Sequence, residues 1–177
     1  VNNVTVNQQQ LTVCTPHDLT KKRREVIIYY HGIGGEGIDE LPLAYQLVQQ
    51  GYEVILPDAY LHSNHDRVKR EDQNLRFFDI IDTTSKRLEE IYHWLENEYK
   101  QPPVVFVGGT SMGGIITAIS LKKYPFINKA AILMGTAKLV DFYHYITAEL
   151  KKGDFPLTEA EEGQLLSHIQ SLDLSQD

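Results

Sequence analysis

The residue of this sequence best suited to chemistry is Ser111, which stands in Gly109-Thr110-Ser111-Met112-Gly113, a G-x-S-x-G pattern. The apolar residues 104–107 before it predict a buried strand, and the apolar positions over 115–121 predict a helix. Between a strand and a helix, such a turn has a strained backbone and projects the serine hydroxyl from the sheet. The pattern therefore predicts a nucleophile. The alternative is a glycine-rich turn whose serine takes no part in chemistry.

A serine nucleophile needs hydrogen-bond donors for the oxyanion that forms when it attacks a carbonyl. One donor is the backbone N–H of the next residue, Met112, and the second should come from the loop after an earlier strand. Residues 26–30 predict that strand, and His31-Gly32-Ile33 follow it. We therefore expect the N–H groups of Met112 and Ile33 to form the oxyanion hole, with His31 and Gly32 as its supporting loop.

The same loop also fits another class of protein. Gly32-Ile33-Gly34-Gly35-Glu36-Gly37 matches G-x-G-x-x-G, and Asp58 lies 21 positions after Gly37. With a strand before the loop and a helix after it, these are features of a dinucleotide-binding unit. However, a strand and a polar stretch precede this unit, His31 stands where a small residue normally packs, and the Ser111 turn is left unexplained. An NAD(P)-binding domain is therefore the less favoured alternative.

Strands and helices are predicted to alternate along the chain. Early strands within 4–14 come first, and strands at 26–30, 52–58, 104–107 and 129–135 then alternate with helices. Those helices begin near Asp39, run over 71–99 and follow Ser111. The alternation predicts an α/β fold with a mainly parallel sheet and helices on both faces. After Gly135 two helical patterns follow, so we expect a core at 1–135 and a helical, lid-like segment at 136–177.

Composition narrows the partners and the location. The chain has 177 residues and a formal net charge of −7, which disfavours nucleic acid and an anionic membrane surface. No apolar run is long enough to cross a membrane, and the first ten residues do not resemble a signal peptide. The single cysteine, Cys14, fits a reducing compartment, so we expect a cytoplasmic protein.

A histidine-rich loop raises the question of a metal. His62, His65 and Asp66 are close together in the sequence, but no further cluster with ligand spacing accompanies them. We therefore expect no metal and no cofactor, and we place residues 59–70 at the rim of a substrate pocket.

Three motifs together resemble the α/β-hydrolase superfamily, and most of all its serine esterases of the dienelactone-hydrolase and prolyl-oligopeptidase-like branch. They are His31-Gly32 after one buried strand, Pro57-Asp58 after the next, and the turn from Gly109 to Gly114. The resemblance covers residues 26–135. It implies hydrolysis of a small-molecule carboxylic ester without a cofactor, through an acyl-enzyme on Ser111. It also implies that His31 is a structural loop residue and not the catalytic base.

The general base and its acid are not assigned by the sequence. In this fold both follow the serine along the chain. The histidines after Ser111 are His144 and His168, in predicted helices, and the candidate acids are Asp141, Asp154 and Asp173. We expect the sequence to stop before the C-terminal strands that carry the acid and base. The strand at 130–135 would then be an exposed edge prone to self-association. A non-catalytic binding domain on the same fold is the second alternative.

Overall fold

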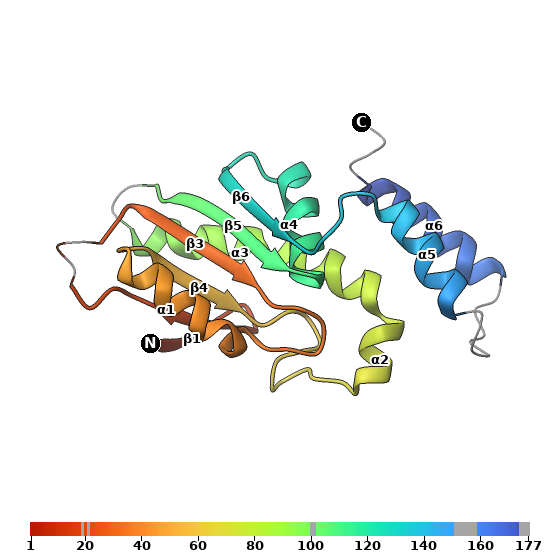
Figure 1. Cartoon of the computed structure of the whole chain (residues 1–177), viewed down its shortest axis with the longest axis horizontal. Coiled ribbons are helices and arrows are strands. Elements are labelled where there is room, and N and C mark those ends of the chain that lie inside the picture. Colours follow the sequence, from red (N-terminus) through yellow and green to blue (C-terminus); the bar gives the residue numbers. More distant parts are fainter. Residues whose placement is uncertain (19, 21, 100–101, 151–158, 174–177) are drawn as a thin grey trace. The chain divides into compact units, whose positions relative to one another are not determined.

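The computed structural model describes residues 1–18, 20, 22–99, 102–150 and 159–173. It divides into two compact units, Val1–Gly135 and Thr136–Asp177, which are considered separately below. The first unit contains a six-stranded sheet in the order β1-β2-β4-β3-β5-β6 (Figure 1). Its strands are β1 (Asn2–Val6), β2 (Gln9–Cys14), β3 (Glu25–Tyr30), β4 (Glu53–Pro57), β5 (Val104–Thr110) and β6 (Ile127–Leu133).

The sheet is mainly parallel, as predicted. β4, β3, β5 and β6 run parallel to one another, while the β1–β2 hairpin is antiparallel and pairs with the outer side of β4. The central strands read as continuous apolar runs because helices cover both of their faces. Val26, Ile28, Val54, Ile55 and Val105 are fully buried. The α/β architecture therefore rests on these runs.

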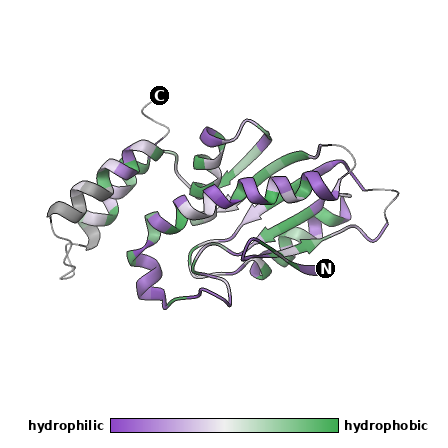
Figure 2. Cartoon of the chain, turned by 180° about the vertical axis from the view of Figure 1, so that it is seen from behind, coloured by the Kyte–Doolittle hydropathy of each residue, from purple (hydrophilic) through white to green (hydrophobic). Residues whose placement is uncertain are grey.

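Helices lie on both faces of the sheet. The short 3₁₀ helix η2 (Gly37–Glu40) leads into α1 (Leu41–Gln49) on one face, and α3 (Phe77–Glu98) and α4 (Met112–Lys123) cover the other. Figure 1 shows α1 in front of the sheet, and Figure 2, seen from behind, shows α3 in front of it with a largely hydrophilic outer side. All residues of α4 from Met112 to Ser120 are buried, so this helix lies inside the unit.

The helix predicted over 71–99 is in fact two helices, and this part of the prediction is wrong. α2 (Arg70–Leu75) ends at Arg76, whose backbone leaves helical geometry (φ −97°, ψ 19°) before α3 begins. The Arg76 guanidinium pairs with the carboxylate of Asp79 at 2.5 Å and packs on the ring of Tyr60. Gln73 of α2 is buried and donates to the carbonyl of Leu61. The contacts with Tyr60 and Leu61 hold α2 and Arg76 against the preceding loop, at the point where the helical pattern is interrupted.

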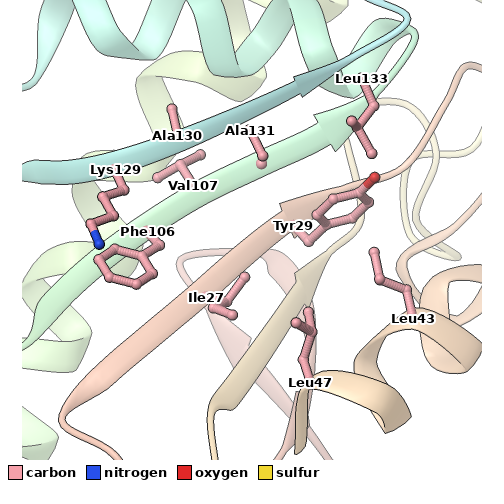
Figure 3. Close-up of a pocket in the computed structure, with 11 residues that line it drawn as sticks. Ile27, Tyr29, Leu43, Leu47, Phe106, Val107, Lys129, Ala130, Ala131 and Leu133 are labelled. Atoms are coloured by element: carbon pink, nitrogen blue, oxygen red, sulfur yellow. The ribbon is translucent and has the colours of Figure 1, made fainter. Parts of the chain in front are cut away.

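One edge of the sheet, and the part of one face between α1 and that edge, are left uncovered by the described residues of this unit. β6 is an edge strand paired only with β5 among the described residues, and Ile132, Leu133 and Met134 are exposed. Beside it, a groove of about 270 Å³ separates β6 from α1 (Figure 3). Its apolar lining comes from Ile27, Tyr29, Leu43, Leu47, Phe106 and neighbouring residues. The exposed edge thus exists, and the self-association expected from it stays a prediction.

The second unit is a pair of helices, α5 (Leu139–Leu150) and α6 (Glu159–Leu172). They pack on each other, and Leu139, Tyr143, Ile169 and Leu172 are buried. The buried carboxylate of Asp173 accepts a hydrogen bond from the backbone N–H of Val140 at 2.7 Å, which ties the end of α6 to the start of α5. Among the described helices of the chain, none combines the length and apolar character needed to span a membrane.

Candidate active site

Ser111 occupies a strained turn at the carboxyl end of β5. Its backbone has φ 56° and ψ −115°, and α4 begins at the next residue. A non-glycine residue rarely adopts a positive φ, and such strain is concentrated at functional sites. The backbone N–H of Ser111 donates to the carbonyl of Leu133 at 2.8 Å, which helps to hold the turn against β6.

The glycines on either side of Ser111 are required by close backbone packing. A Cβ on Gly109 would lie 2.4 Å from the backbone of Gly113, and a Cβ on Gly113 would lie 2.1 Å from the carbonyl oxygen of Tyr30. Neither neighbour is a flexible side chain that could move aside. The turn therefore brings the start of α4 directly against the end of β3.

The loop after β3 lies beside the serine. A Cβ built on Gly32 would be 3.8 Å from the Cβ of Ser111 and 3.7 Å from the carbonyl oxygen of Thr110. Residues 32–35 of this loop form a type II turn. The N–H of Gly35 donates to the carbonyl of Gly32 at 3.1 Å, and Gly34 has a φ of 81°. Among the described residues, no hydrogen-bond partner is found for Met112 N–H or Ile33 N–H. Two free donors on neighbouring loops suit an oxyanion.

His31 is a buried residue that links two loops through hydrogen bonds. Its Nε2 accepts the backbone N–H of Ala59 at 3.0 Å, so the ring proton is on Nδ1, which donates to the carbonyl of Gly32 at 2.7 Å. Burial lowers the pKa of His31 to about 4, against the opposing effect of its bond to Gly32. Both ring nitrogens are thus engaged in a neutral imidazole, which fits a structural part for this residue.

His62 forms a second hydrogen-bonded link between loops, which the sequence did not predict. It is buried, its Nε2 accepts the N–H of Gly34 at 3.0 Å, and its Nδ1 lies 2.9 Å from the carbonyl of Tyr60. Burial lowers the pKa of His62, with smaller contributions from neighbouring arginines. The rings of His31 and His62 lie 5.1 Å apart. Together they fix the loop at 31–37 to the loop at 59–62, and no local pattern signals such a long-range contact.

The backbone N–H groups of the G-x-G-x-x-G loop that could bind a phosphate are already hydrogen-bonded within the protein. The backbone N–H groups of Gly34 through Gly37 donate to His62, Gly32, Asp39 and Asp58 in turn. Asp58, which would bind a ribose in a dinucleotide site, accepts from Gly37 at 2.8 Å, and burial raises its pKa. Since a phosphate needs free N–H groups at this position, the geometry disfavours nucleotide binding.

The histidine-rich loop is used for internal hydrogen bonds. Asp66 accepts from the backbone and hydroxyl of Ser63, and His65 lies 3.1 Å from the side-chain nitrogen of Gln10. Within the part of the chain that the structure describes, no group of three or more His, Cys, Asp or Glu side chains is arranged to hold a metal ion.

The candidate acid and base residues belong to the helical unit. Asp141 and His144 are exposed on α5, and His168 is exposed on α6. Asp173 is engaged at the start of α5, and Asp154 lies outside the described residues. In the first unit, His31 and His62 are engaged in hydrogen bonds with backbone groups, and no described histidine is hydrogen-bonded to Ser111. The structure therefore assigns no base to Ser111.

The buried imidazole of His31 should make the stability of the fold depend on pH. In the unfolded chain a histidine titrates near pH 6.5, whereas His31 in the folded chain titrates at about 4. Between these values the folded state binds fewer protons, so the free energy of unfolding should rise with pH. This contribution is complete above about pH 6.5 and is lost towards pH 4, by about 3 kcal/mol. Urea unfolding at pH 7.0 and 4.5 measures it.

Two variants separate this effect from general acid sensitivity. His31→Asn should lose much of the stability difference between the two pH values, while His17→Asn, at an exposed histidine, should keep it. Equal differences in the wild type and His31→Asn would show that His31 is not the source.

Fold and site together define an α/β hydrolase of the serine type. The profile of the family described as serine aminopeptidase, S33, matches residues 21–153, about three quarters of the sequence, and the chain belongs to this family. An esterase-type serine hydrolase is the class of enzyme that the family and the relatives support.

One relative is named as an esterase, and solved structures share the fold. The chain is 28% identical over 158 residues to the Bacillus subtilis protein named "Putative esterase YitV", covering 85% of this chain and 60% of that protein. The fold is similar to dienelactone hydrolase from Anabaena variabilis (TM-score 0.58, 20% identity, 80% of this chain and 63% of that one). It is also similar to acetyl xylan esterase from Aspergillus awamori (TM-score 0.54, 20% identity, 76% and 52%). The chain thus spans less than two thirds of each of these proteins.

Proposed function

We propose that this chain carries the nucleophile and oxyanion half of an esterase, which cleaves small-molecule carboxylic esters through an acyl-enzyme on Ser111. The observation that supports this most is the positive φ of Ser111 in a turn that Gly109 and Gly113 make possible. Evolution tolerates backbone strain where the surrounding structure holds it for a purpose. The relative named as an esterase supports the reaction class, and the geometry supports the choice of residue.

The proposed reaction uses the turn at Ser111 and the loop after β3. Ser111 Oγ attacks the ester carbonyl, and the N–H groups of Met112 and Ile33 stabilise the oxyanion. The tetrahedral intermediate expels the alcohol, and water then hydrolyses the acyl-enzyme. A general base must take the serine proton and return it to the alcohol. We propose that the base and its acid lie outside the first unit and that α5 and α6 form a lid-like segment. We also propose that the protein is cytoplasmic.

Ester hydrolysis tests the nucleophile. Ser111→Ala should reduce the hydrolysis of 4-nitrophenyl butyrate below the wild-type rate, because no acyl-enzyme can form, and what remains should come from the oxyanion hole alone. An oxyanion hole without a complete triad retains about 10³–10⁴-fold catalysis over water in a related reaction, so wild-type activity should be measurable even if the base is absent. Ser167→Ala, at an exposed serine of α6, should behave as the wild type.

The same comparison tests a second candidate, a non-catalytic binding domain. The observation that favours it is that no described histidine of the first unit is hydrogen-bonded to Ser111. Equal hydrolysis by the wild type and Ser111→Ala, with the fold preserved, would support the binding domain and refute the esterase.

A further inference from the structure

The ring of Tyr29 lies across the strand that leads into the Ser111 turn. Tyr29 is paired with Gly108 in the β3–β5 register, and a Cβ built on Gly108 would lie 3.1 Å from Cδ2 and 3.3 Å from Cε2 of the tyrosine. The ring therefore occupies the place that a side chain on Gly108 would need. Figure 3 shows this ring near the carboxyl end of β3, with its oxygen directed towards the end of β6 at Leu133.

The hydroxyl of Tyr29 meets the residue just before the proposed nucleophile. Tyr29 Oη lies 2.5 Å from Thr110 Oγ1, and either of the two hydroxyls can be the donor. The tyrosine side chain is buried and lines the apolar groove between α1 and β6. Burial raises the pKa of Tyr29, against the opposing effect of its bond to Thr110, so the phenol is neutral near pH 7. A hydrogen bond in such apolar surroundings is stronger than one in water.

The turn that follows Thr110 needs support because its backbone is strained. Ser111 has a φ of 56°, and a conformation of this kind persists only where surrounding contacts hold it. On the side of β6, the N–H of Ser111 donates to the carbonyl of Leu133 at 2.8 Å. On the face of the sheet opposite α4, the bond between Tyr29 and Thr110 is a second such contact. The turn is therefore supported by both neighbouring strands of β5.

We propose that Tyr29 is a positioning residue for the nucleophile, which it keeps in its reactive orientation through the side chain of Thr110. Thr110 adjoins Ser111, so a fixed Thr110 side chain limits rotation of the peptide group that joins the two residues. Without this bond the turn can relax, and Ser111 Oγ then moves relative to the proposed oxyanion donors. A displacement of about 1 Å at a reacting group can cost roughly 10² in rate. The inference rests on Ser111 being the esterase nucleophile.

Removing either hydroxyl tests this role by kinetics. Tyr29→Phe keeps the ring over Gly108, and its kcat for 4-nitrophenyl butyrate should fall about tenfold with KM within about twofold of the wild type. Thr110→Val should behave alike, and the double variant should be no slower than either single variant, because all three remove one interaction. Thr110→Ser, which retains the hydroxyl, should keep most of the activity. The rate with Ser111→Ala is subtracted as background.

Tyr30→Phe is the matched control. Tyr30 is the next residue of β3, its side chain is fully buried, and no hydrogen-bond partner is found for its hydroxyl among the described residues. This variant loses the same atom from the same strand, so its kcat should equal that of the wild type. An unchanged kcat in Tyr29→Phe, an equal loss in Tyr30→Phe, or single losses that multiply in the double variant would overturn the proposal.

Amide hydrogen exchange keeps the inference separate from the proposed function. In Tyr29→Phe the amide of Ser111 should exchange about tenfold faster than in the wild type, while amides in the interior of β3 keep their rates. Tyr30→Phe should leave both unchanged. If this pattern occurs but the wild type hydrolyses no ester, the esterase assignment fails and the support of the turn by Tyr29 stands. If exchange at Ser111 is unchanged, or quickens equally throughout β3, Tyr29 does not position the turn and the proposal fails.

Discussion

Replacing Ile33 by proline should lower kcat/KM for ester hydrolysis by about 10²–10³, the loss expected when one oxyanion donor is removed. Proline lacks the backbone N–H that this residue is proposed to donate. The substitution also suits the backbone, because Ile33 is the second residue of a type II turn, where proline is common. Activity should therefore fall without loss of stability. Steady-state kinetics and thermal unfolding of the same sample measure both.

Ile33→Ala is the matched control for the proline variant. It removes the side chain but keeps the N–H group, so it should retain activity within a few-fold of the wild type. Equal loss in the alanine and proline variants would mean that the isoleucine side chain matters and that its N–H does not. Full activity in Ile33→Pro would remove this residue from the oxyanion hole.

Replacing Gly113 by alanine should destabilise the first unit by about 3 kcal/mol or more. The new Cβ would meet the carbonyl oxygens of Tyr30 at 2.1 Å and of His31 at 2.9 Å. Both are backbone atoms at the end of a central strand, so relief requires α4 to move away from the sheet. Denaturant unfolding of the purified variant measures the loss.

Gly32→Ala provides the comparison within the same site. Its Cβ would find Thr110 and Ser111 at 3.7 and 3.8 Å, which is ordinary van der Waals contact. We expect this variant to stay within about 1 kcal/mol of the wild type. If both glycine variants were equally stable, the close approach of α4 to β3 described here would be wrong.

The sequence predicted the elements that depend on local pattern. The apolar runs around Val26–Tyr30 and Val104–Val107 predicted buried parallel strands, and the structure has them as β3 and β5. The G-x-S-x-G pattern predicted the turn at Ser111 because only glycine fits its crowded flanks. The α/β fold and the hydrolase class followed from these features together, and the family match confirms them.

What the sequence missed depends on contacts between distant residues. His62 pairs with Gly34, 28 positions away, and no spacing rule indicates that a histidine in a polar loop is buried. At the break near Arg76, the guanidinium packs on the ring of Tyr60, 16 positions away, and no local pattern indicates this contact.

The most direct test of the central claim is covalent labelling of Ser111. Treatment of the folded chain with a fluorophosphonate, followed by intact-protein mass spectrometry and peptide sequencing, should give a single adduct on Ser111. The adduct should be absent from Ser111→Ala and present in Ser167→Ala. No adduct on the folded wild type, or an adduct that persists in Ser111→Ala, would contradict the assignment of Ser111 as the nucleophile.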